Sequence, residues 1–203
     1  VYIGLFGGTF NPLHFGHLRS AEEICDRYKM KEVIFIPSAN PPHKKAPDMA
    51  SPIHRLKMVN LSITGNPNFS VSEIELHRKG KSYSIDTVRK LKEDYPDDDL
   101  AFIMGMDAFL ELDTWHKYEQ LLTECDFIVT TRPGSGQKGG LKLIPESIRG
   151  GYKKKRGQKV YEHSSGKKII FAEITDIGIS GTQIRRMVKD NVSIRYLTPR
   201  RVM

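Results

Sequence analysis

The chain has 203 residues, of which 38% are hydrophobic, and it carries a formal net charge of +8. This length allows one sizeable core, while no apolar run approaches the about 18 residues of a membrane-spanning helix. The first residues also lack the pattern of a secretion signal. The positive charge permits nucleic-acid binding, but an enzyme for phosphate-rich small molecules needs positive potential too. The basic runs at 153–156, 167–168 and 200–201 have no interleaved aromatic residues, so solvated surface is favoured over a nucleic-acid platform.

The first element is an apolar run over residues 1–6 that predicts a buried strand. A glycine-rich turn follows, and then a helical pattern over about residues 18–28. His14 and His17 stand three positions apart where that helix begins. Glycines let backbone N–H groups approach an anion closely, and a helix N-terminus adds partial positive charge. The segment therefore predicts a phosphate site; zinc ranks low because no nearby Cys or carboxylate completes a ligand set.

Further apolar runs alternate with helical patterns along the chain. Strands are expected at 32–37, 69–76, 100–104, 126–130 and 168–172, and helices around 51–64, 84–94, 108–125 and 181–189. Continuous apolar strands separated by helices predict an α/β fold, a Rossmann-like doubly wound parallel sheet with helices on both faces. Such sheets bind ligands at the carboxyl ends of their strands, where the glycine turn lies.

The segment at about 133–167 is rich in Gly, Ser and Lys and has the weakest pattern. We expect a long surface excursion there, with a short helix near 145–149. It is too long for an ordinary connection. The chain shows no internal repeat, so residues 1–203 are expected to form a single domain. The two cysteines, Cys25 and Cys125, fit small apolar side chains in a reducing compartment, which favours the cytoplasm.

Two further clusters follow predicted strands. After the second strand, two prolines stiffen a loop that carries Asn40, His43 and Lys44; alone, this loop fits a turn with an exposed lysine equally well. After the strand at 100–104 come Asp107, which could accept hydrogen bonds from a ribose or a base, and Trp115, which offers a face for stacking. Taken alone, such a tryptophan is more often part of a core.

The start of the last helix carries a third cluster. Ser180 is expected to be its N-cap, and Thr182 and Arg185 lie three positions apart on one face. Capping alone explains Ser180, but it does not explain the hydroxyl and the arginine together. A bound phosphate explains all three residues.

The motifs Gly8–His17 and Ile179–Arg185 resemble the nucleotidyltransferase superfamily, which is marked by His-x-Gly-His and by a second Ser-x-Thr-x-x-Arg motif. Within it, the segments 40–44, 83–87 and 105–107, together with Trp115, resemble the bacterial nicotinate-nucleotide adenylyltransferases. The similarity covers nearly the whole chain. One departure is Gly181, where members often carry serine; because glycine leaves its N–H available, no loss of activity is expected.

The resemblance implies that nicotinate mononucleotide and ATP are joined to give deamido-NAD and pyrophosphate. It implies Mg2+ as the companion of the triphosphate, held mainly by phosphates and water rather than by protein ligands. The catalytic residues it implies are His14, His17, Lys44 and Arg185. The ATP-binding residues it implies are Gly7, Gly8, Thr9, Phe10, His14, His17, Gly105, Asp107, Ile179, Ser180, Thr182 and Arg185. The substrate-binding residues it implies are Asn40, His43, Lys44, Tyr83, Ser84, Asp107, Trp115 and Arg132.

Two alternatives stay open at this point. A sibling enzyme, such as a phosphopantetheine or nicotinamide-mononucleotide adenylyltransferase or a cytidylyltransferase, would share the phosphate motifs. A basic nucleic-acid-binding protein would show a weak affinity with a steep dependence on salt. No nucleic acid and no membrane are expected as partners, and the sequence leaves a homo-oligomer open.

Overall fold

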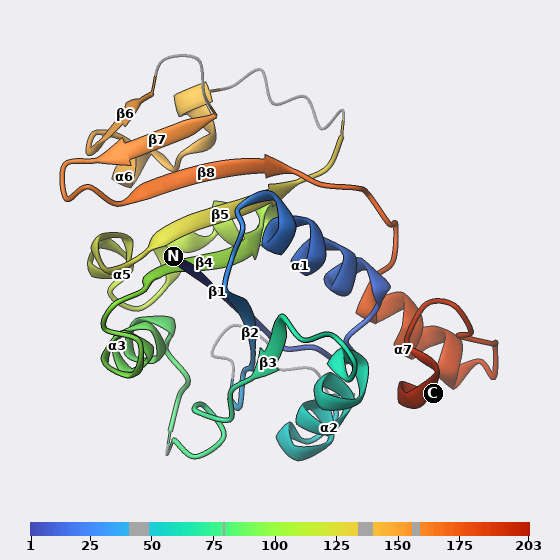
Figure 1. Ribbon diagram of the computed structural model, residues 1–203. Helices are drawn as coiled ribbons and strands as arrows, with labels where there is room; N and C mark the ends of the chain where they lie inside the picture. Colours follow the sequence, from blue (N-terminus) through green and yellow to red (C-terminus); the bar gives the residue numbers. More distant parts are fainter. Residues whose placement is uncertain (41–48, 79, 134–139, 156–158) are drawn as a thin grey trace.

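The computed structural model describes residues 1–40, 49–78, 80–133, 140–155 and 159–203. Strands and helices alternate through most of the chain (Figure 1). The strands are β1 (Tyr2–Gly8), β2 (Glu32–Pro37), β3 (Phe69–Val71), β4 (Asp99–Gly105), β5 (Asp126–Thr131), β6 (Tyr152–Lys154), β7 (Val160–His163) and β8 (Lys168–Glu173). The helices are α1 (Phe15–Arg27), α2 (Pro52–Ile63), α3 (Ser84–Asp94), α4 (Met106–Leu110), α5 (Tyr118–Glu124), α6 (Glu146–Arg149) and α7 (Gly181–Lys189), with 3-10 turns η1 (Leu112–Thr114), η2 (Gly140–Leu143) and η3 (Arg200–Val202).

The strands of the described ranges form one sheet in the order β3-β2-β1-β4-β5-β8-β7-β6. The pairs from β3 to β8 are parallel, whereas β7 pairs antiparallel with both β8 and β6. The order reverses between β1 and β4, which are neighbours although β2 and β3 lie between them in sequence. This is the switch point at which doubly wound sheets bind ligands. The predicted α/β fold is confirmed.

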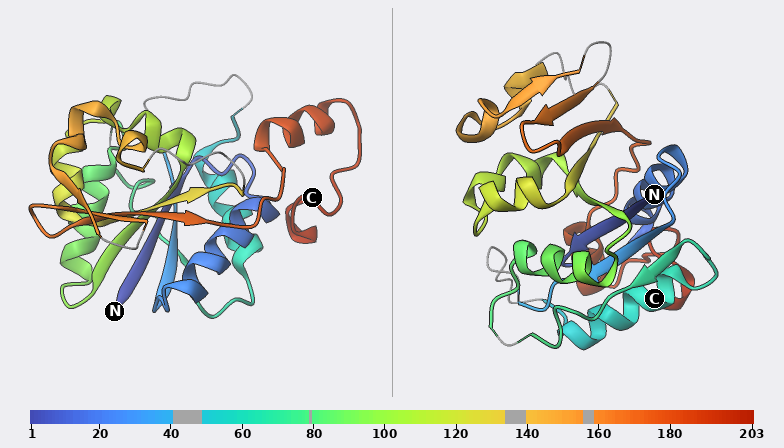
Figure 2. Two further views of the ribbon diagram at one scale, coloured as in Figure 1. Left: turned by 90° about the horizontal axis from the view of Figure 1, so that it is seen from above. Right: turned by 60° about the vertical axis from the view of Figure 1, so that its left-hand side comes forward.

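Alternation along the strands divides the core into two layers. Ile34 and Ile36 of β2 pack with α3, α4 and α5 on one face, whereas Val33 and Phe35 pack with α1 and α2 on the other. Successive side chains of a strand point to opposite faces, so strands that are apolar throughout bury both faces. Figure 2 shows these two helix layers, and it shows α7 and the C-terminus standing at one end of the sheet.

Two of the predicted elements are shorter than expected. The strand expected at 69–76 ends at Val71, and the turn that follows includes Glu75. The prediction of a single helix at 108–125 is wrong, because α4, η1 and α5 occupy this range. The helix is interrupted where the backbone of Trp115 is extended and that of Lys117 is left-handed (φ 53°). Asp113 and Thr114 in that segment form helices poorly, and Leu112 beside them is completely buried.

The segment 133–167 contributes more to the core than its composition indicates. The expected short helix is α6, but β6 and β7 were not predicted, and they extend the sheet beyond β8. Tyr152 and Tyr161 on these strands are buried, as is Ile148 of α6. An antiparallel strand with one buried face needs only one apolar residue in two, so a strand of three or four residues leaves little signal in the sequence.

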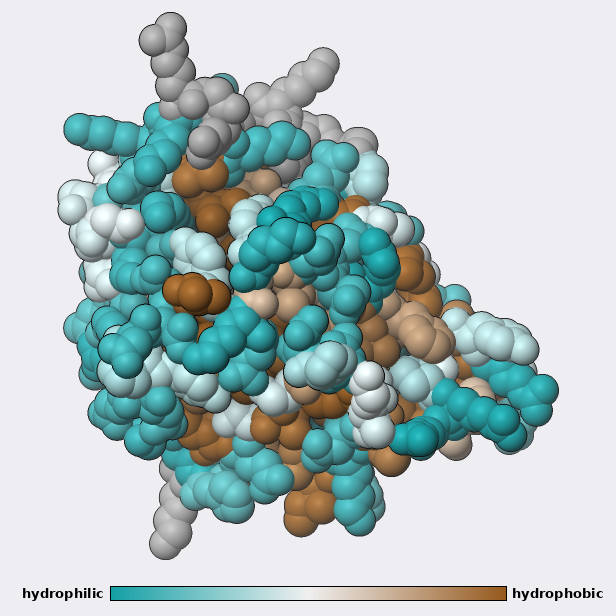
Figure 3. All heavy atoms as spheres, in the orientation of Figure 1, coloured by the Kyte–Doolittle hydropathy of each residue, from teal (hydrophilic) through white to brown (hydrophobic). Residues whose placement is uncertain are grey.

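Among the described residues, no helix is long and apolar enough to cross a bilayer. The view in Figure 3 shows apolar side chains scattered among hydrophilic ones. Exposed apolar residues occur on several elements, for example Ile53 on α2 and Leu110 on α4. Cys25 and Cys125 are buried free thiols, in keeping with their expected role as small apolar side chains.

Candidate functional site

The glycine turn after β1 is held in place by packing of the Phe10 side chain, which belongs to the turn itself. Phe10 has a positive φ of 47° and is only 3% exposed, with its ring packed against Phe6 and Phe35. A Cβ on Gly8 would lie 2.9 Å from the Phe10 ring, so a larger residue there would displace the turn. Phe10 thus shapes the turn with its side chain, and only its backbone is available to a ligand.

The two histidines lie against each other at the start of α1. His14 is the N-cap residue and His17 belongs to the first turn, and their rings stack at 3.7 Å between centroids. Burial lowers the pKa of His14 to about 4, so this imidazole is neutral at pH 7. The backbone N–H of His14 donates to Nδ1 of His17 at 3.4 Å. The proton of a neutral His17 ring therefore lies on Nε2, which makes that atom a donor.

The last helix brings the second motif to the first. Ser180 caps α7, as predicted, by accepting from the backbone N–H of Gln183 at 3.1 Å. Arg185 donates from Nη1 to the carbonyl of Asn11 at 2.8 Å and from Nη2 to Oγ1 of Thr182 at 3.2 Å. Residues 174 positions apart in sequence thus meet at one place. The pairing of Thr182 with Arg185 expected from helical spacing is confirmed.

Gly181 has a packing role at this junction. A Cβ built on it would lie 3.1 Å from the carbonyl oxygen of Asn11 and 3.5 Å from Nη1 of Arg185. The first distance is short enough that the backbone would have to move by a few tenths of an ångström. Glycine therefore lets α7 approach the turn after β1 closely.

On the other side of the switch point, the loop after β2 meets the loop before α3. Asn40 and Ser82 are joined by two hydrogen bonds of 3.3 Å: the Asn40 N–H donates to the Ser82 hydroxyl, and the Ser82 N–H donates to the Asn40 carbonyl. The ring of the next residue, Tyr83, lies against that of His116, with centroids 4.2 Å apart and the planes tilted by 30°. Trp115 is half-buried and lies edge-on to Phe102. The predicted residues Asn40, Tyr83, Ser84 and Trp115 thus come from neighbouring segments.

The remaining predicted residues lie along the same edge of the sheet. Register pairs Phe6 with Ile103, so the ends of β1 and β4 lie side by side. Gly105 is the last residue of β4, and the exposed Asp107 lies in the first turn of α4. Arg132 follows β5, is 69% exposed and pairs with Asp176 at 3.6 Å. Gly7 and Thr9 belong to the end of β1 and its turn, and Ile179 precedes α7. His43 and Lys44 lie outside the described residues.

The donor set of this edge suits phosphate oxygens. Imidazole, guanidinium and backbone N–H groups are hydrogen-bond donors, whereas magnesium prefers oxygen ligands. In the described ranges, no group of three His, Cys, Asp or Glu side chains could hold a metal ion. The chain thus fits a metal that arrives with phosphates better than one held by protein ligands.

One group beside this edge was missed by sequence reasoning. Arg55 of α2 is completely buried and donates to backbone carbonyls of the loops after β1 and β2. Glu75, also buried, accepts from the hydroxyl of Thr87 in the first turn of α3 at 2.9 Å. An arginine between His54 and Leu56 in an amphipathic helix has no sequence signal for this role, because its partners are main-chain atoms.

Comparison with known proteins agrees with this geometry. Residues 5–187 match the model of the cytidylyltransferase-like family. A protein of Citrifermentans bemidjiense named probable nicotinate-nucleotide adenylyltransferase is 44% identical over 97% of this chain and 91% of its own length. A protein of the same name from Pelobacter propionicus is 43% identical over 98% of this chain and 93% of its own length. The chain belongs to the nicotinate-nucleotide adenylyltransferase family. The resemblance drawn from the motifs, and with it the prediction of a nucleotidyltransferase, is confirmed.

Solved structures support the fold independently. Nicotinic acid mononucleotide adenylyltransferase of Plasmodium falciparum in complex with NaAD has a TM-score of 0.71 at 19% identity, covering 95% of this chain and 86% of that one. The same enzyme in complex with APC has a TM-score of 0.68 at 18% identity, with the same coverage. At such low identity the likeness concerns the fold, which agrees with the observed sheet.

Proposed function

We propose that the chain transfers the adenylyl group of ATP to nicotinate mononucleotide, giving deamido-NAD and pyrophosphate. The observation that carries this proposal is the contact of Arg185 with Asn11, which joins the start of α7 to the histidine-bearing turn after β1. The N-termini of α1 and α7 then lie near one another at the switch point, together with His14, His17 and Arg185. Membership of the family supplies the substrate class.

The chemistry needs no proton transfer from the nucleophile. A phosphate oxygen of nicotinate mononucleotide attacks the α-phosphorus of ATP, the new P–O bond forms, and the bond to the bridging oxygen breaks as pyrophosphate leaves. The nucleophile is already anionic at neutral pH, so catalysis rests on positioning and on stabilising the charge that develops on the phosphates. A neutral His14, whose pKa lies near 4, fits hydrogen-bond donation rather than general-base work.

The triphosphate is assigned to the first edge of the site. His17 would donate from Nε2, as its contact with the His14 backbone requires. Arg185 would hold the β and γ oxygens with its guanidinium, assisted by the Thr182 hydroxyl and by N–H groups at the start of α7, near Ser180 and Ile179. Gly7, Gly8, Thr9 and the Phe10 backbone would line the α-phosphate side. Lys44 keeps the role of a further cation that its sequence position suggests.

Magnesium would be bound by phosphate oxygens and water in this site, since no group of three His, Cys, Asp or Glu side chains in the described ranges could hold it. When bound, the ion supplies positive charge to the triphosphate and to the departing pyrophosphate. The part left to the chain is to orient the complex through His14, His17 and Arg185.

The nicotinate side is assigned to the loops that Asn40 and Ser82 join. Tyr83, the N-cap of α3, makes no capping hydrogen bond with its side chain, so first-turn N–H groups near Ser84 remain to receive the pyridine carboxylate. Trp115 would stack on the pyridine ring. The other expected contacts are His43 and Asn40 with the mononucleotide, Arg132 with its phosphate, and Gly105 and Asp107 with the adenosine.

Recognition by N–H groups would favour the acid over the amide. The amide substrate would turn an NH2 donor toward N–H donors and leave both unpaired, at a cost of about 1–3 kcal/mol for each group. We further propose that the chain acts as a single domain in the cytoplasm, with ATP and the mononucleotide as its partners rather than nucleic acid.

The test is pyrophosphate release with Mg-ATP and either nicotinate or nicotinamide mononucleotide offered in parallel. Faster turnover with the acid, by about tenfold or more, supports both the reaction and the recognition of the carboxylate. Equal rates would contradict the account of specificity. Turnover with neither mononucleotide would contradict the reaction itself.

A further inference from the structure

Arg55 makes an unusual set of contacts for an arginine in a helix. Its side chain is completely buried, and its guanidinium donates to four backbone carbonyls. Nε bonds to Ala50 at 3.1 Å, Nη1 to Thr9 at 2.7 Å, and Nη2 to Ser38 at 2.6 Å and to Ala39 at 3.3 Å. No carboxylate oxygen is among these four acceptors.

The four carbonyls belong to three separate segments. Thr9 lies in the turn after β1, Ser38 and Ala39 follow β2, and Ala50 precedes α2. The β1–β2 ladder ends with the Ser38 N–H, which donates to the Gly8 carbonyl at 2.9 Å. Beyond that bond, the planar fork of the guanidinium ties the Thr9 carbonyl to the carbonyls of Ser38 and Ala39. Lysine could not replace this fork, because three donors on one nitrogen cannot reach four carbonyls in different directions.

The contacts continue toward α3. Asn40 follows directly after two of the bonded carbonyls, and its reciprocal hydrogen bonds with Ser82 lead to Tyr83 and the first turn of α3. Burial lowers the pKa of Arg55 and raises the pKa of Glu75, and the attraction of Glu75 opposes the first of these two shifts. Arg55 thus connects the histidine-bearing turn to the loops on the nicotinate side.

We propose that Arg55 is a positioning residue that fixes the turn at Thr9 relative to the segment 38–40, and thereby aligns the two substrates for attack. This inference rests on the proposed function, in which the turn after β1 holds the triphosphate and the loops near Asn40 hold the mononucleotide. Arg55 touches neither substrate. Its effect is on the distance and angle between them, to which in-line displacement is sensitive.

The test compares Arg55→Lys and Arg55→Met with the wild-type chain, measuring kcat, the KM for each substrate and the unfolding midpoint. A matched control is Asp126→Asn. Asp126 is also buried, but it lies at the opposite end of the sheet, where it accepts from the Tyr2 hydroxyl at 2.5 Å and from the Lys168 N–H at 2.9 Å. It reports the effect of losing a buried polar contact that has no connection to the site.

The proposal predicts that Arg55→Met lowers kcat/KM by about 100-fold and raises the KM for both substrates, since a displacement of about 1 Å can cost that much. Arg55→Lys, which keeps the charge but not the fork, should lose about tenfold. Asp126→Asn should lower the unfolding midpoint and leave both KM values unchanged. A purely structural Arg55 would reduce only the active fraction, and therefore only the apparent kcat.

Unchanged KM values in folded Arg55 variants would overturn the proposal. If neither variant folds, Ser82→Ala decides: it breaks the contact from the Asn40 N–H without removing a buried charge. The proposal predicts a higher KM for the mononucleotide with the KM for ATP unchanged, and an unchanged mononucleotide KM would overturn it. Failure of the proposed function would appear differently, as a wild-type chain without turnover.

Discussion

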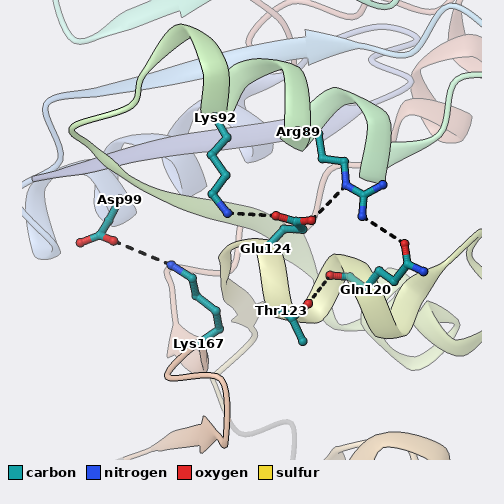
Figure 4. Close-up of polar contacts among 7 residues, drawn as sticks. All are labelled: Arg89, Lys92, Asp99, Gln120, Thr123, Glu124 and Lys167. Atoms are coloured by element: carbon teal, nitrogen blue, oxygen red, sulfur yellow. Dashed lines mark hydrogen bonds and ion pairs between the residues drawn. The ribbon is translucent and has the colours of Figure 1, made fainter.

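Basic side chains make different kinds of contact in two regions of the molecule. At the carboxyl edge of the sheet, Arg55 is buried and bonds to main-chain carbonyls. Between α3 and α5, Arg89 and Lys92 form ion pairs with Glu124 near the surface, at 3.0 Å and 2.9 Å, and Arg89 also donates to Gln120 (Figure 4). The first arrangement sets the positions of loops, whereas the second joins the surfaces of two helices.

The difference lies in solvent exposure. The side chains of Arg89 and Lys92 are about half exposed, so water and salt screen their attraction to Glu124, and such pairs contribute about 1 kcal/mol or less. A buried guanidinium with all its partners in place costs much more to disturb, because the carbonyls it leaves behind cannot find water. The location of a charge, rather than its type, therefore decides whether activity or stability responds to its removal.

The largest effect is expected at Arg185. Replacement by alanine removes a cation assigned to the triphosphate and should lower kcat/KM by about 10²- to 10³-fold, with the unfolding midpoint nearly unchanged. Steady-state kinetics with both substrates measure this. Arg186→Ala is the matched control, since that neighbour is 84% exposed and pairs only loosely with Asp190 at 3.7 Å. An equal loss of kcat/KM in Arg185→Ala and Arg186→Ala would contradict the assignment of Arg185 to the triphosphate.

The lowered pKa of His14 predicts that the free energy of unfolding depends on pH. Its pKa is about 4 in the folded chain and about 6.5 when unfolded, so the unfolded state binds more protons between these values. The free energy of unfolding should fall by about 3 kcal/mol as the pH drops from 6.5 to 4, and this contribution should level off below pH 4. Urea titrations of the wild type and His14→Asn test it. Parallel pH curves for the two would contradict a buried, neutral His14.

Replacing Trp115 should affect both the binding of the mononucleotide and the stability of the chain, and two variants distinguish these effects. Trp115→Ala removes the face assigned to the pyridine ring and should raise the KM for nicotinate mononucleotide about tenfold, with little change for ATP. It should also destabilise the chain, because Trp115 packs edge-on to Phe102. Trp115→Phe keeps an aromatic face and should retain most of the affinity. An unchanged mononucleotide KM in the alanine variant would remove the stacking assignment.

The smallest effect is expected on the surface. Hydrogen bonding from Lys92, with a further contribution from Arg89, lowers the pKa of Glu124, so the pairs persist at neutral pH. Glu124→Gln should reduce the free energy of unfolding by less than about 1 kcal/mol, more at low salt than at high salt, and should leave kcat unchanged. A loss of activity in this variant would show that the α3–α5 surface communicates with the site.

The parallel part of the fold was predictable because its strands are apolar throughout and its helices have clear periodicity. Residues 32–37 and 84–94 agree with β2 and α3 in their bounds. The failures have physical reasons. The break in 108–125 depends on a left-handed Lys117, and β6 and β7 rest on isolated tyrosines in a segment rich in glycine and lysine.

The local arrangement of the candidate site residues was predictable where it follows from helix geometry. Ser180, Thr182 and Arg185 follow from capping and helical spacing, and His14 and His17 from their place at a helix start. The burial of Phe10, the contact between the rings of Tyr83 and His116, and the buried position of Arg55 were not predictable. Each depends on backbone atoms or on segments brought together only by the folded sheet.

The most direct test of the central assignment is a crystal structure of the chain with a non-hydrolysable ATP analogue and Mg2+. The assignment predicts triphosphate oxygens within hydrogen-bond distance of Nε2 of His17 and of the Arg185 guanidinium, and no protein carboxylate bound directly to the metal. A triphosphate bound elsewhere, for example in the basic groove that Lys153, Lys154 and His163 line on β6 and β7, would contradict it.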